Sequence, residues 1–228
     1  AIRPKKNQIK VLAILPIVGS SERCVGSVRF HLLHALSACH SGLIRRGANV
    51  TNHLDTFLRN AAAQKPDNLA IIDQNDRRLN WSEVWQATCD ARDRLHDAGV
   101  QPGDRVVLVL ENCVEVVAFF FAITMLQASA VAVNARMTQD ELSRITEHSD
   151  PSALVFTTSS SRDARVHAEQ CSARPVTGAF GEVAIATRAE SQPETAYSDP
   201  SEQVALLLYT SGTTGAPKAA MLTHTNLM

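Results

Sequence analysis

The sequence predicts an α/β protein in which a layered parallel sheet carries helices on both faces. From about residue 51 onward, short apolar runs alternate with segments of helical periodicity, and this alternation is typical of parallel strands joined by crossover helices. The predicted strands 105–110 and 153–156 are apolar at every position except Arg105, as in strands buried on both faces. With 228 residues, 45% hydrophobic residues and a net charge of -1, the composition excludes a disordered chain and gives no sign of nucleic-acid binding.

The first predicted elements are a helix and a hairpin. Leu54, Phe57, Leu58 and Ala61 follow the i, i+3, i+4, i+7 spacing of one helical face, and Thr51 or Asn52 is placed to cap that helix. Beyond Lys65 and Pro66, "LAIID" predicts a strand, "QNDRR" a turn and "LNW" the returning strand.

A long helix should follow this hairpin. Ser82 is the expected N-cap, with Glu83 in the first turn, where its charge favours the helix dipole. Gly99 should end the helix at the C′ position. The buried strand 105–110 comes next, and a helix over 114–127 follows it.

The same rhythm continues with a short strand at 130–133. Thr138 and Glu141 have the spacing of a capping box for another helix, and 153–156 is the next strand. Weaker signals predict a helix near 163–171, strands near 175–177 and 183–186, and an exposed connection at 191–200. The strong apolar strand 204–210 comes after them.

The first fifty residues differ from the rest in charge. They hold eight Lys and Arg but a single acid, Glu22, whereas residues 51–228 hold 14 basic and 22 acidic residues. They also lack a steady hydrophobic period. We therefore expect a domain boundary near Thr51, with residues 1–50 an atypical basic extension that is unstructured or not native. An organellar transit peptide and translated upstream sequence are both compatible with this composition.

The cysteine pattern favours free thiols. Five cysteines occur without a CxxC pair, which is typical of a reducing compartment. We predict no zinc site, because the cluster of His31, His34, Cys39 and His40 lacks a closing ligand pair. The apolar run 116–125 falls short of the roughly 20 residues of a membrane span and predicts a buried helix. We expect a cytoplasmic location, with organellar targeting by residues 1–50 as the alternative.

The stretch "TSGTTGAPK", which begins at Thr210 at the end of strand 204–210, has the chemistry of a phosphate-binding loop. Its glycines permit tight turns and close approach of backbone amides to a ligand, its hydroxyls donate hydrogen bonds, and its lysine supplies positive charge. Pro217 and the apolar residues after the lysine predict a second strand, hence a hairpin rather than a Walker loop. The candidate binding residues are Thr210, Ser211, Gly212, Thr213, Thr214, Gly215 and Lys218. For His224, near an expected helix start, a functional and a structural role are both open.

This stretch resembles the phosphate-binding signature of the AMP-forming adenylating enzymes, which include acyl-CoA synthetases, luciferases and peptide-synthetase adenylation domains. The similarity continues through "LTHTN" and extends upstream through "LNWSEV", "GVQPGDRVVLVLENCVEVVAFFFAIT" and "NARMTQDELSRITEHSDPSALVF". Ala128, Ser129 and Ala135 depart from the glycine and proline that the family typically shows there. Residues 1–50 have no counterpart that we recognise.

The resemblance implies a reaction in which a carboxylate attacks the α-phosphorus of Mg-ATP to give an acyl-adenylate and pyrophosphate. A thiol, often coenzyme A, then accepts the acyl group. The resemblance assigns the loop residues to the β- and γ-phosphates of ATP. It places the adenine-binding segments, the Mg²⁺-binding Glu and the catalytic Lys beyond the signature, so we expect an N-terminal fragment without catalytic residues that is inactive alone. The alternatives are a non-catalytic phosphate-binding protein, or one half of a split enzyme completed by a C-terminal chain.

Overall fold

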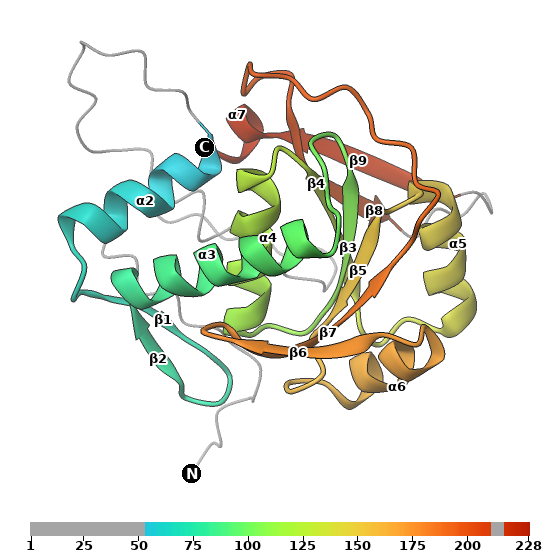
Figure 1. Ribbon diagram of the computed structural model, residues 1–228, viewed down its shortest axis with the longest axis horizontal. Helices are drawn as coiled ribbons and strands as arrows, with labels where there is room; N and C mark the ends of the chain where they lie inside the picture. Colours follow the sequence, from blue (N-terminus) through green and yellow to red (C-terminus); the bar gives the residue numbers. More distant parts are fainter. Residues whose placement is uncertain (1–52, 211–216) are drawn as a thin grey trace, which may run out of the picture.

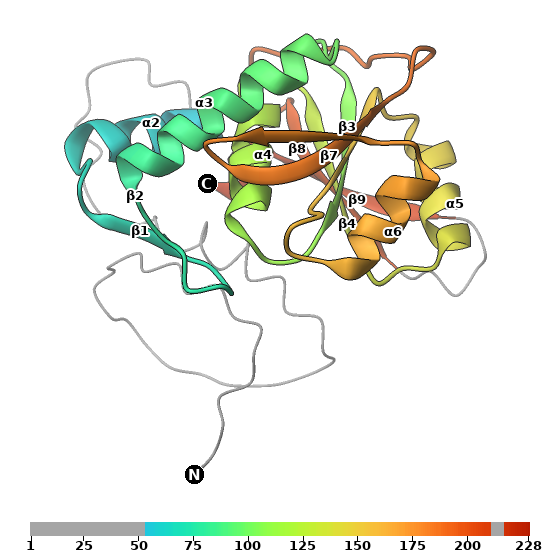
Figure 2. The same ribbon diagram turned by 60° about the horizontal axis from the view of Figure 1, so that its bottom comes forward.

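Seven strands form the main sheet of the protein, with helices on both of its faces (Figures 1 and 2). The computed structural model describes residues 53–210 and 217–228. The strand order is β6-β7-β5-β3-β4-β8-β9, and a separate antiparallel pair, β1-β2, precedes the sheet in the chain. The strands are β1 Leu69–Ile72, β2 Arg78–Asn80, β3 Arg105–Leu110, β4 Ser129–Asn134, β5 Ala153–Phe156, β6 Arg174–Gly178, β7 Gly181–Thr187, β8 Val204–Thr210 and β9 Lys218–Thr223.

The four central strands, β5, β3, β4 and β8, run parallel. This confirms the predicted α/β fold with a parallel sheet at its centre. The outer strands β7, β6 and β9 are each antiparallel to the strand beside them. Strands β7 and β9 therefore run opposite to the four central strands, whereas β6, being antiparallel to β7, runs in the central direction. The pairs β6-β7 and β8-β9 are hairpins, and a short turn can join only antiparallel strands.

The helices divide between the two faces of the sheet. Figure 2 shows α2, α3 and α4 on one side and α5 and α6 on the other. The sheet separates two hydrophobic cores, the first beneath α2, α3 and α4 and the second beneath α5 and α6. Successive side chains of β3 enter them in turn: Val106 and Leu108 belong to the first core, and Val107 and Val109 belong to the second. The helices are α2 Leu54–Gln64, α3 Trp81–Asp97, α4 Val114–Met125, α5 Gln139–Ser149, α6 Arg162–Gln170 and α7 His224–Leu227.

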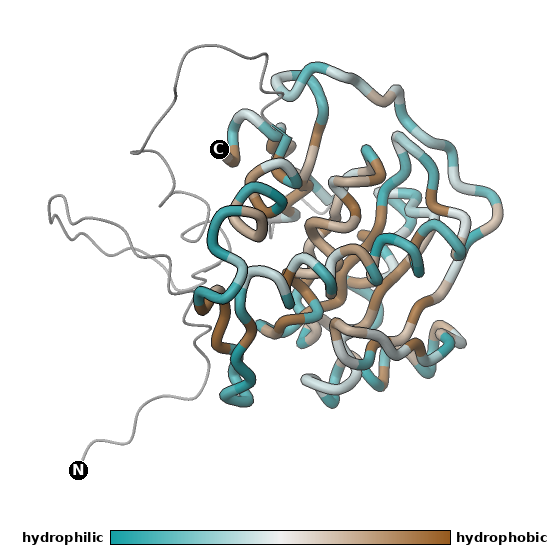
Figure 3. Tube along the Cα trace, turned by 60° about the vertical axis from the view of Figure 1, so that its left-hand side comes forward, coloured by the Kyte–Doolittle hydropathy of each residue, from teal (hydrophilic) through white to brown (hydrophobic). Residues whose placement is uncertain are grey.

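Helix α4 is the buried helix that the sequence predicts. Eleven of its twelve residues are buried, as expected for a helix that is apolar around its whole circumference. Figure 3 shows hydrophobic segments of the chain gathered in the interior of the domain. Among the helices within 53–210 and 217–228, none is long and apolar enough to cross a membrane.

The charged residue inside this helix, Glu115, is 3% exposed and has an ion partner. Its Oε1 lies 2.9 Å from Nη2 of Arg77, whose Nε lies 3.1 Å from Oδ2 of Asp73. Nη1 of Arg77 also donates to the carbonyl oxygen of Phe180. One arginine therefore joins the β1-β2 turn, helix α4 and the β6-β7 turn, and it compensates the buried carboxylates.

Two predicted helix caps need correction or lie outside the described residues. The prediction that Ser82 caps α3 is wrong: Oδ1 of Asn80 accepts from the backbone N–H of Glu83, and the Glu83 side chain accepts from the backbone N–H of Asn80. Strand β2 runs directly into the helix, so the last strand residue becomes the cap. For α2 the N-cap position is His53, without a side-chain capping bond. Thr51 and Asn52 lie outside the described residues.

Other local predictions are confirmed. Thr138 and Glu141 form both bonds of the capping box, and Gly99 follows the end of α3 with φ +88°. The predicted boundary near Thr51 stays a prediction, because residues 1–52 lie outside the described residues.

The connection from β7 to β8, residues 188–203, contains no buried residue over 191–200, which confirms the predicted exposed connection, and it is also hydrogen-bonded to the sheet. We call it the strap, because it crosses the edge of the sheet at which the parallel strands begin. The backbone N–H of Glu194 donates to the carbonyl oxygen of Gly103 at 2.9 Å. Arg105, the first residue of β3, donates to Oε1 of Glu194 and to the carbonyl oxygen of Gln192, both at 2.7 Å. The strap thereby carries the chain across the sheet to β8.

We expect Gly103→Ala to destabilise the protein more than Gly99→Ala. Both glycines have positive φ, +86° and +88°, but a Cβ on Gly103 would lie 1.9 Å from the carbonyl oxygen of Glu194, whereas a Cβ on Gly99 meets nothing within 4 Å. Gly99→Ala should cost about 1 kcal/mol of backbone strain, and Gly103→Ala about 2–4 kcal/mol, because the strap must also shift. Urea unfolding of the two variants measures the difference, and equal losses would contradict the strap contact.

Candidate functional site

The predicted phosphate-binding segment is carried by the β8-β9 hairpin. The antiparallel register runs from Val204 paired with Thr223 to Thr210 paired with Lys218, with an irregularity between Val204 and Leu206. The predicted second strand is therefore confirmed. Ser211, Gly212, Thr213, Thr214 and Gly215 lie outside the described residues, so their predicted role stays a prediction.

Lys218 begins strand β9 directly across from Thr210. Its side chain is exposed, and within the described part of the chain it forms no ion pair. A lysine ammonium in this state is a mobile positive charge available to an anion from solvent. The strand register therefore places Lys218, the charged candidate residue, where the loop ends and β9 begins.

The strand that leads into the loop is attached to the helix layer by Tyr209. The phenol oxygen lies 2.7 Å from Nδ1 of His148 near the end of α5. Burial raises the pKa of the Tyr209 phenol, so the hydroxyl stays protonated at neutral pH. No local sequence signal predicts this contact, because the two residues are 61 positions apart.

The ends of the parallel strands carry a polar cluster that sequence analysis also missed. Arg136 Nε lies 3.0 Å from Oε1 of Glu111. The backbone N–H of Glu111 donates to Thr157 Oγ1, and that of Arg136 donates to Oδ1 of Asn134. These residues end or follow β3, β4 and β5. Strand β8 is parallel to them, so the loop leaves the sheet at the edge where open α/β sheets ordinarily bind ligands.

His224 has a structural task. Its side chain is completely buried, and its Nδ1 accepts from the backbone N–H of Leu54 at 3.1 Å. Leu54 is the first residue of α2, so His224 supplies the cap that His53 does not. The ring also contacts His53 edge-on, with centroids 4.7 Å apart. Burial, and secondarily the charge of His53, lower the pKa of His224 to about 4.

The described cysteines are free thiols. Cys113 is buried, whereas Cys89 and Cys171 are partly exposed. Burial, with the nearby Glu115 charge as a smaller cause, raises the pKa of Cys113 well above its ordinary value. No three metal-ligating side chains come together in the described ranges. The stretch around His31, His34, Cys39 and His40 lies outside those ranges.

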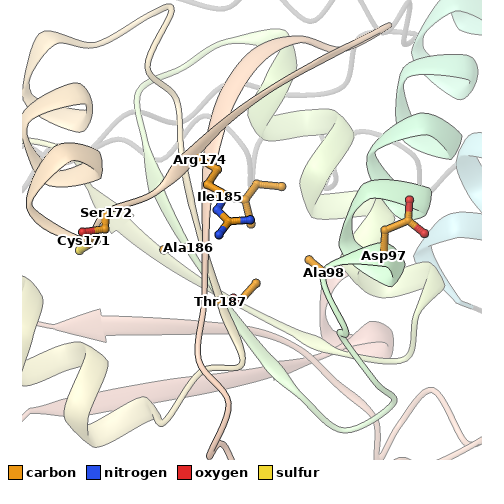
Figure 4. A pocket seen from close by; sticks show the side chains of 8 residues that line it. All are labelled: Asp97, Ala98, Cys171, Ser172, Arg174, Ile185, Ala186 and Thr187. Atoms are coloured by element: carbon orange, nitrogen blue, oxygen red, sulfur yellow. The ribbon is translucent and has the colours of Figure 1, made fainter.

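A cleft of about 550 Å³ lies away from the predicted loop, near the edge of the sheet at which the parallel strands begin (Figure 4). It is lined by the end of α3 at Asp97, the turn at Cys171 and Ser172, Arg174 of β6 and the end of β7 at Thr187. Thr187 pairs with Ala153, the first residue of β5, so the cleft adjoins the edge at which the parallel strands begin. It contains none of the predicted loop residues.

Comparison with known proteins identifies relatives of this chain. The family model for AMP-binding enzymes matches residues 58–228. The chain is 31% identical over 182 residues to an oxalate–CoA ligase of Arabidopsis thaliana, covering 76% of this chain and 35% of that protein. It is 30% identical over 173 residues to the long-chain-fatty-acid–CoA ligase FadD13 of Mycobacterium tuberculosis, covering 74% and 34%. A long-chain-fatty-acid–AMP ligase, FadD26 of Mycobacterium marinum, is 29% identical, covering 77% and 32%.

Solved structures give the same fold. The N-terminal domain of FACL13 from Mycobacterium tuberculosis superposes with a TM-score of 0.57 at 23% identity, covering 75% of this chain and 44% of that one. The long-chain-fatty-acid–CoA ligase FadD1 from Archaeoglobus fulgidus gives a TM-score of 0.56 at 24% identity, covering 75% and 37%. At these identities the likeness establishes the fold. The chain spans about a third of the length of the curated relatives named above.

We expect stability to fall as His224 becomes protonated. The folded-state pKa of about 4 lies below the ordinary 6.5, so the unfolded chain binds the proton first. The contribution of the neutral ring is then complete above pH 6.5 and is lost as pH falls toward 4. His224→Ala should cost about 1–2 kcal/mol at pH 7.5 through loss of the cap.

The matched control is His224→Asn, whose Oδ1 can accept the Leu54 N–H without titrating in this range. Urea unfolding at pH 7.5, 6.5, 5.5 and 4.5 should give a shallower loss of stability for His224→Asn than for the unmodified protein. Equal pH dependence in both proteins would contradict the buried neutral histidine.

Proposed function

Because this chain belongs to the AMP-binding enzyme family, we propose that its β8-β9 hairpin carries the ATP phosphate-binding loop of an enzyme that activates a carboxylic acid. The proposed binding residues are Thr210, Ser211, Gly212, Thr213, Thr214, Gly215 and Lys218. The observation that carries the proposal is the strand register, which holds Lys218 opposite Thr210 on either side of the loop.

The names of the relatives support acyl-adenylate formation as the common step. An oxalate–CoA ligase and a long-chain-fatty-acid–CoA ligase differ in the acid they ligate, whereas an AMP ligase differs from both in the product named. Activation of a carboxylate with AMP is compatible with all three. We propose this step for the protein, with coenzyme A as the acceptor thiol in a second step, and leave the acid unassigned.

In the proposed step, a carboxylate oxygen forms a bond to the α-phosphorus of ATP. The bond from that phosphorus to the bridging oxygen breaks, and pyrophosphate leaves with the electron pair. Negative charge grows on the leaving group, so backbone amides, hydroxyl donors and the Lys218 ammonium stabilise the transition state. Mg²⁺ enters as the counter-ion of ATP. The described residues bring no three metal-ligating side chains together, so we assign Mg²⁺ no protein ligands and derive no step through it.

We propose residues 51–228 as the N-terminal part of the AMP-binding domain and residues 1–50 as an extension outside it. The extent of the family match, residues 58–228, supports this division. The abrupt change in charge balance near residue 50 supports it independently.

The first test is binding of pyrophosphate and ATP to the 228-residue protein. We expect a Kd of about 1 mM, or about 4 kcal/mol, and at least about tenfold weaker binding by Lys218→Ala, because the ammonium interacts directly with phosphate oxygens. NMR titration at constant ionic strength is the measurement. Lys65→Ala is the matched control, since Lys65 is also an exposed lysine beside a secondary-structure boundary. Equal affinities for Lys218→Ala and Lys65→Ala would refute the proposed phosphate site.

Catalysis is tested separately by acid-dependent exchange of labelled pyrophosphate into ATP over short, medium, long-chain and aromatic carboxylates. The chain spans about a third of the length of its relatives, so we expect binding without exchange above a Lys218→Ala control. Lysine-dependent exchange would show instead that these residues suffice for adenylation.

A further inference from the structure

We propose that Tyr209 and His148 form a positioning pair that fixes Lys218 at the phosphate site. The inference rests on the proposed function and extends it to two residues outside the glycine-rich stretch. Tyr209 immediately precedes that stretch, and His148 lies on α5, a helix of the second face (Figure 1).

The contact between the two side chains is both polar and aromatic. The Tyr209 hydroxyl lies 2.7 Å from Nδ1 of His148. The two rings are perpendicular at 90°, with centroids 5.7 Å apart. The Tyr209 ring packs at the same time against the second core, to which α5 contributes the buried Leu142 and Ile145. The tyrosine is thereby fixed at its ring and at its hydroxyl.

The position of Lys218 depends on this strand. Tyr209 pairs with Ala219, and Thr210 pairs with Lys218. Strand β9 lies at the edge of the sheet and has β8 as its sheet neighbour, so a displacement of β8 near Tyr209 moves Lys218 with it. Among the described residues of β8 and β9 from 205 to 222, Tyr209 makes the one side-chain hydrogen bond to another element.

Two roles for the contact between Tyr209 and His148 can be told apart. A purely structural role would affect the free energy of unfolding, whereas a positioning role would affect the affinity for phosphate. The His148 side chain is exposed, so breaking an exposed polar contact should barely change global stability. The affinity for phosphate should change, however, if the contact sets the place of the charged lysine, since misplacement of a binding group weakens its interaction. Stability and phosphate affinity therefore separate the two roles.

The experiment measures the Kd for inorganic pyrophosphate by NMR titration of the 228-residue protein. Tyr209→Phe and His148→Ala should each weaken binding about fivefold, and the double variant no more than either single one, because each removes the same bond. His148→Asn, which presents an oxygen acceptor near the position of Nδ1, should recover most of the affinity. Tyr197→Phe is the matched control, because Tyr197 is the other tyrosine of the chain and lies on the strap.

Urea unfolding midpoints should stay unchanged in all these variants, whereas amide exchange at Lys218 and Ala219 should accelerate in Tyr209→Phe and His148→Ala. Unchanged affinity in Tyr209→Phe, together with weaker binding by Lys218→Ala, would overturn the positioning pair and leave the proposed function standing. Insensitivity to Lys218→Ala would instead overturn the proposed function. Additive losses in the double variant, or losses that follow the unfolding midpoint, would also overturn the pair.

Discussion

The pairing of β8 with β4 is the interaction on which the candidate site depends. After β7 the chain leaves the sheet at its other end, and the strap returns it beside β4. There Ala130, Val131 and Ala132 pair in parallel with residues 206–208, and Ser129 Oγ donates to the carbonyl oxygen of Val204 at 2.8 Å. Strand β9 has β8 as its sheet neighbour. Without this ladder, neither Lys218 nor the segment after it would have a defined place.

The hairpin is held on both sides by histidine contacts of different character. On the entry side, the exposed His148 side chain contacts the Tyr209 hydroxyl. On the exit side, His224 is buried and caps α2 across 170 positions of sequence. The buried contact ties the segment after β9 to the first described helix, so the two ends of the described chain stabilise each other. These anchors give a rigid base to the two strands that flank the proposed phosphate-binding loop, as ligand-binding loops on α/β scaffolds require.

Among the described residues, the arginines Arg136 and Arg77 are ion-paired, whereas Lys218 beside the loop is not. Arg136 pairs with Glu111 at the ends of the parallel strands, and Arg77 compensates the buried Asp73 and Glu115. Lys218 is exposed instead, with no ion pair among the described residues. A lysine already paired to a carboxylate would have to break that pair before it could bind phosphate. Its free state suits the proposed stabilisation of a departing pyrophosphate.

The sequence by itself determined the type and place of most elements, because their signals are local. Apolar runs located β3 and β5, and the spacing of Thr138 and Glu141 located the start of α5. The predicted cap of α3 was wrong by two residues. Asn80 and Ser82 both have side chains that favour the N-cap position, and Asn80 is the cap because β2 ends at Asn80 and the helix begins at the next residue. The loop chemistry could be predicted because it lies within nine consecutive residues, and it stays a prediction because Ser211 to Gly215 lie outside the described residues. The tertiary structure alone decided the place of β7 between β5 and β6, the close approach of the strap to Gly103, the capping of α2 by His224 and the contact of Tyr209 with His148. These depend on which distant segments the sheet brings together, and hydrophobic periodicity carries no information about partners 61 or 170 positions away.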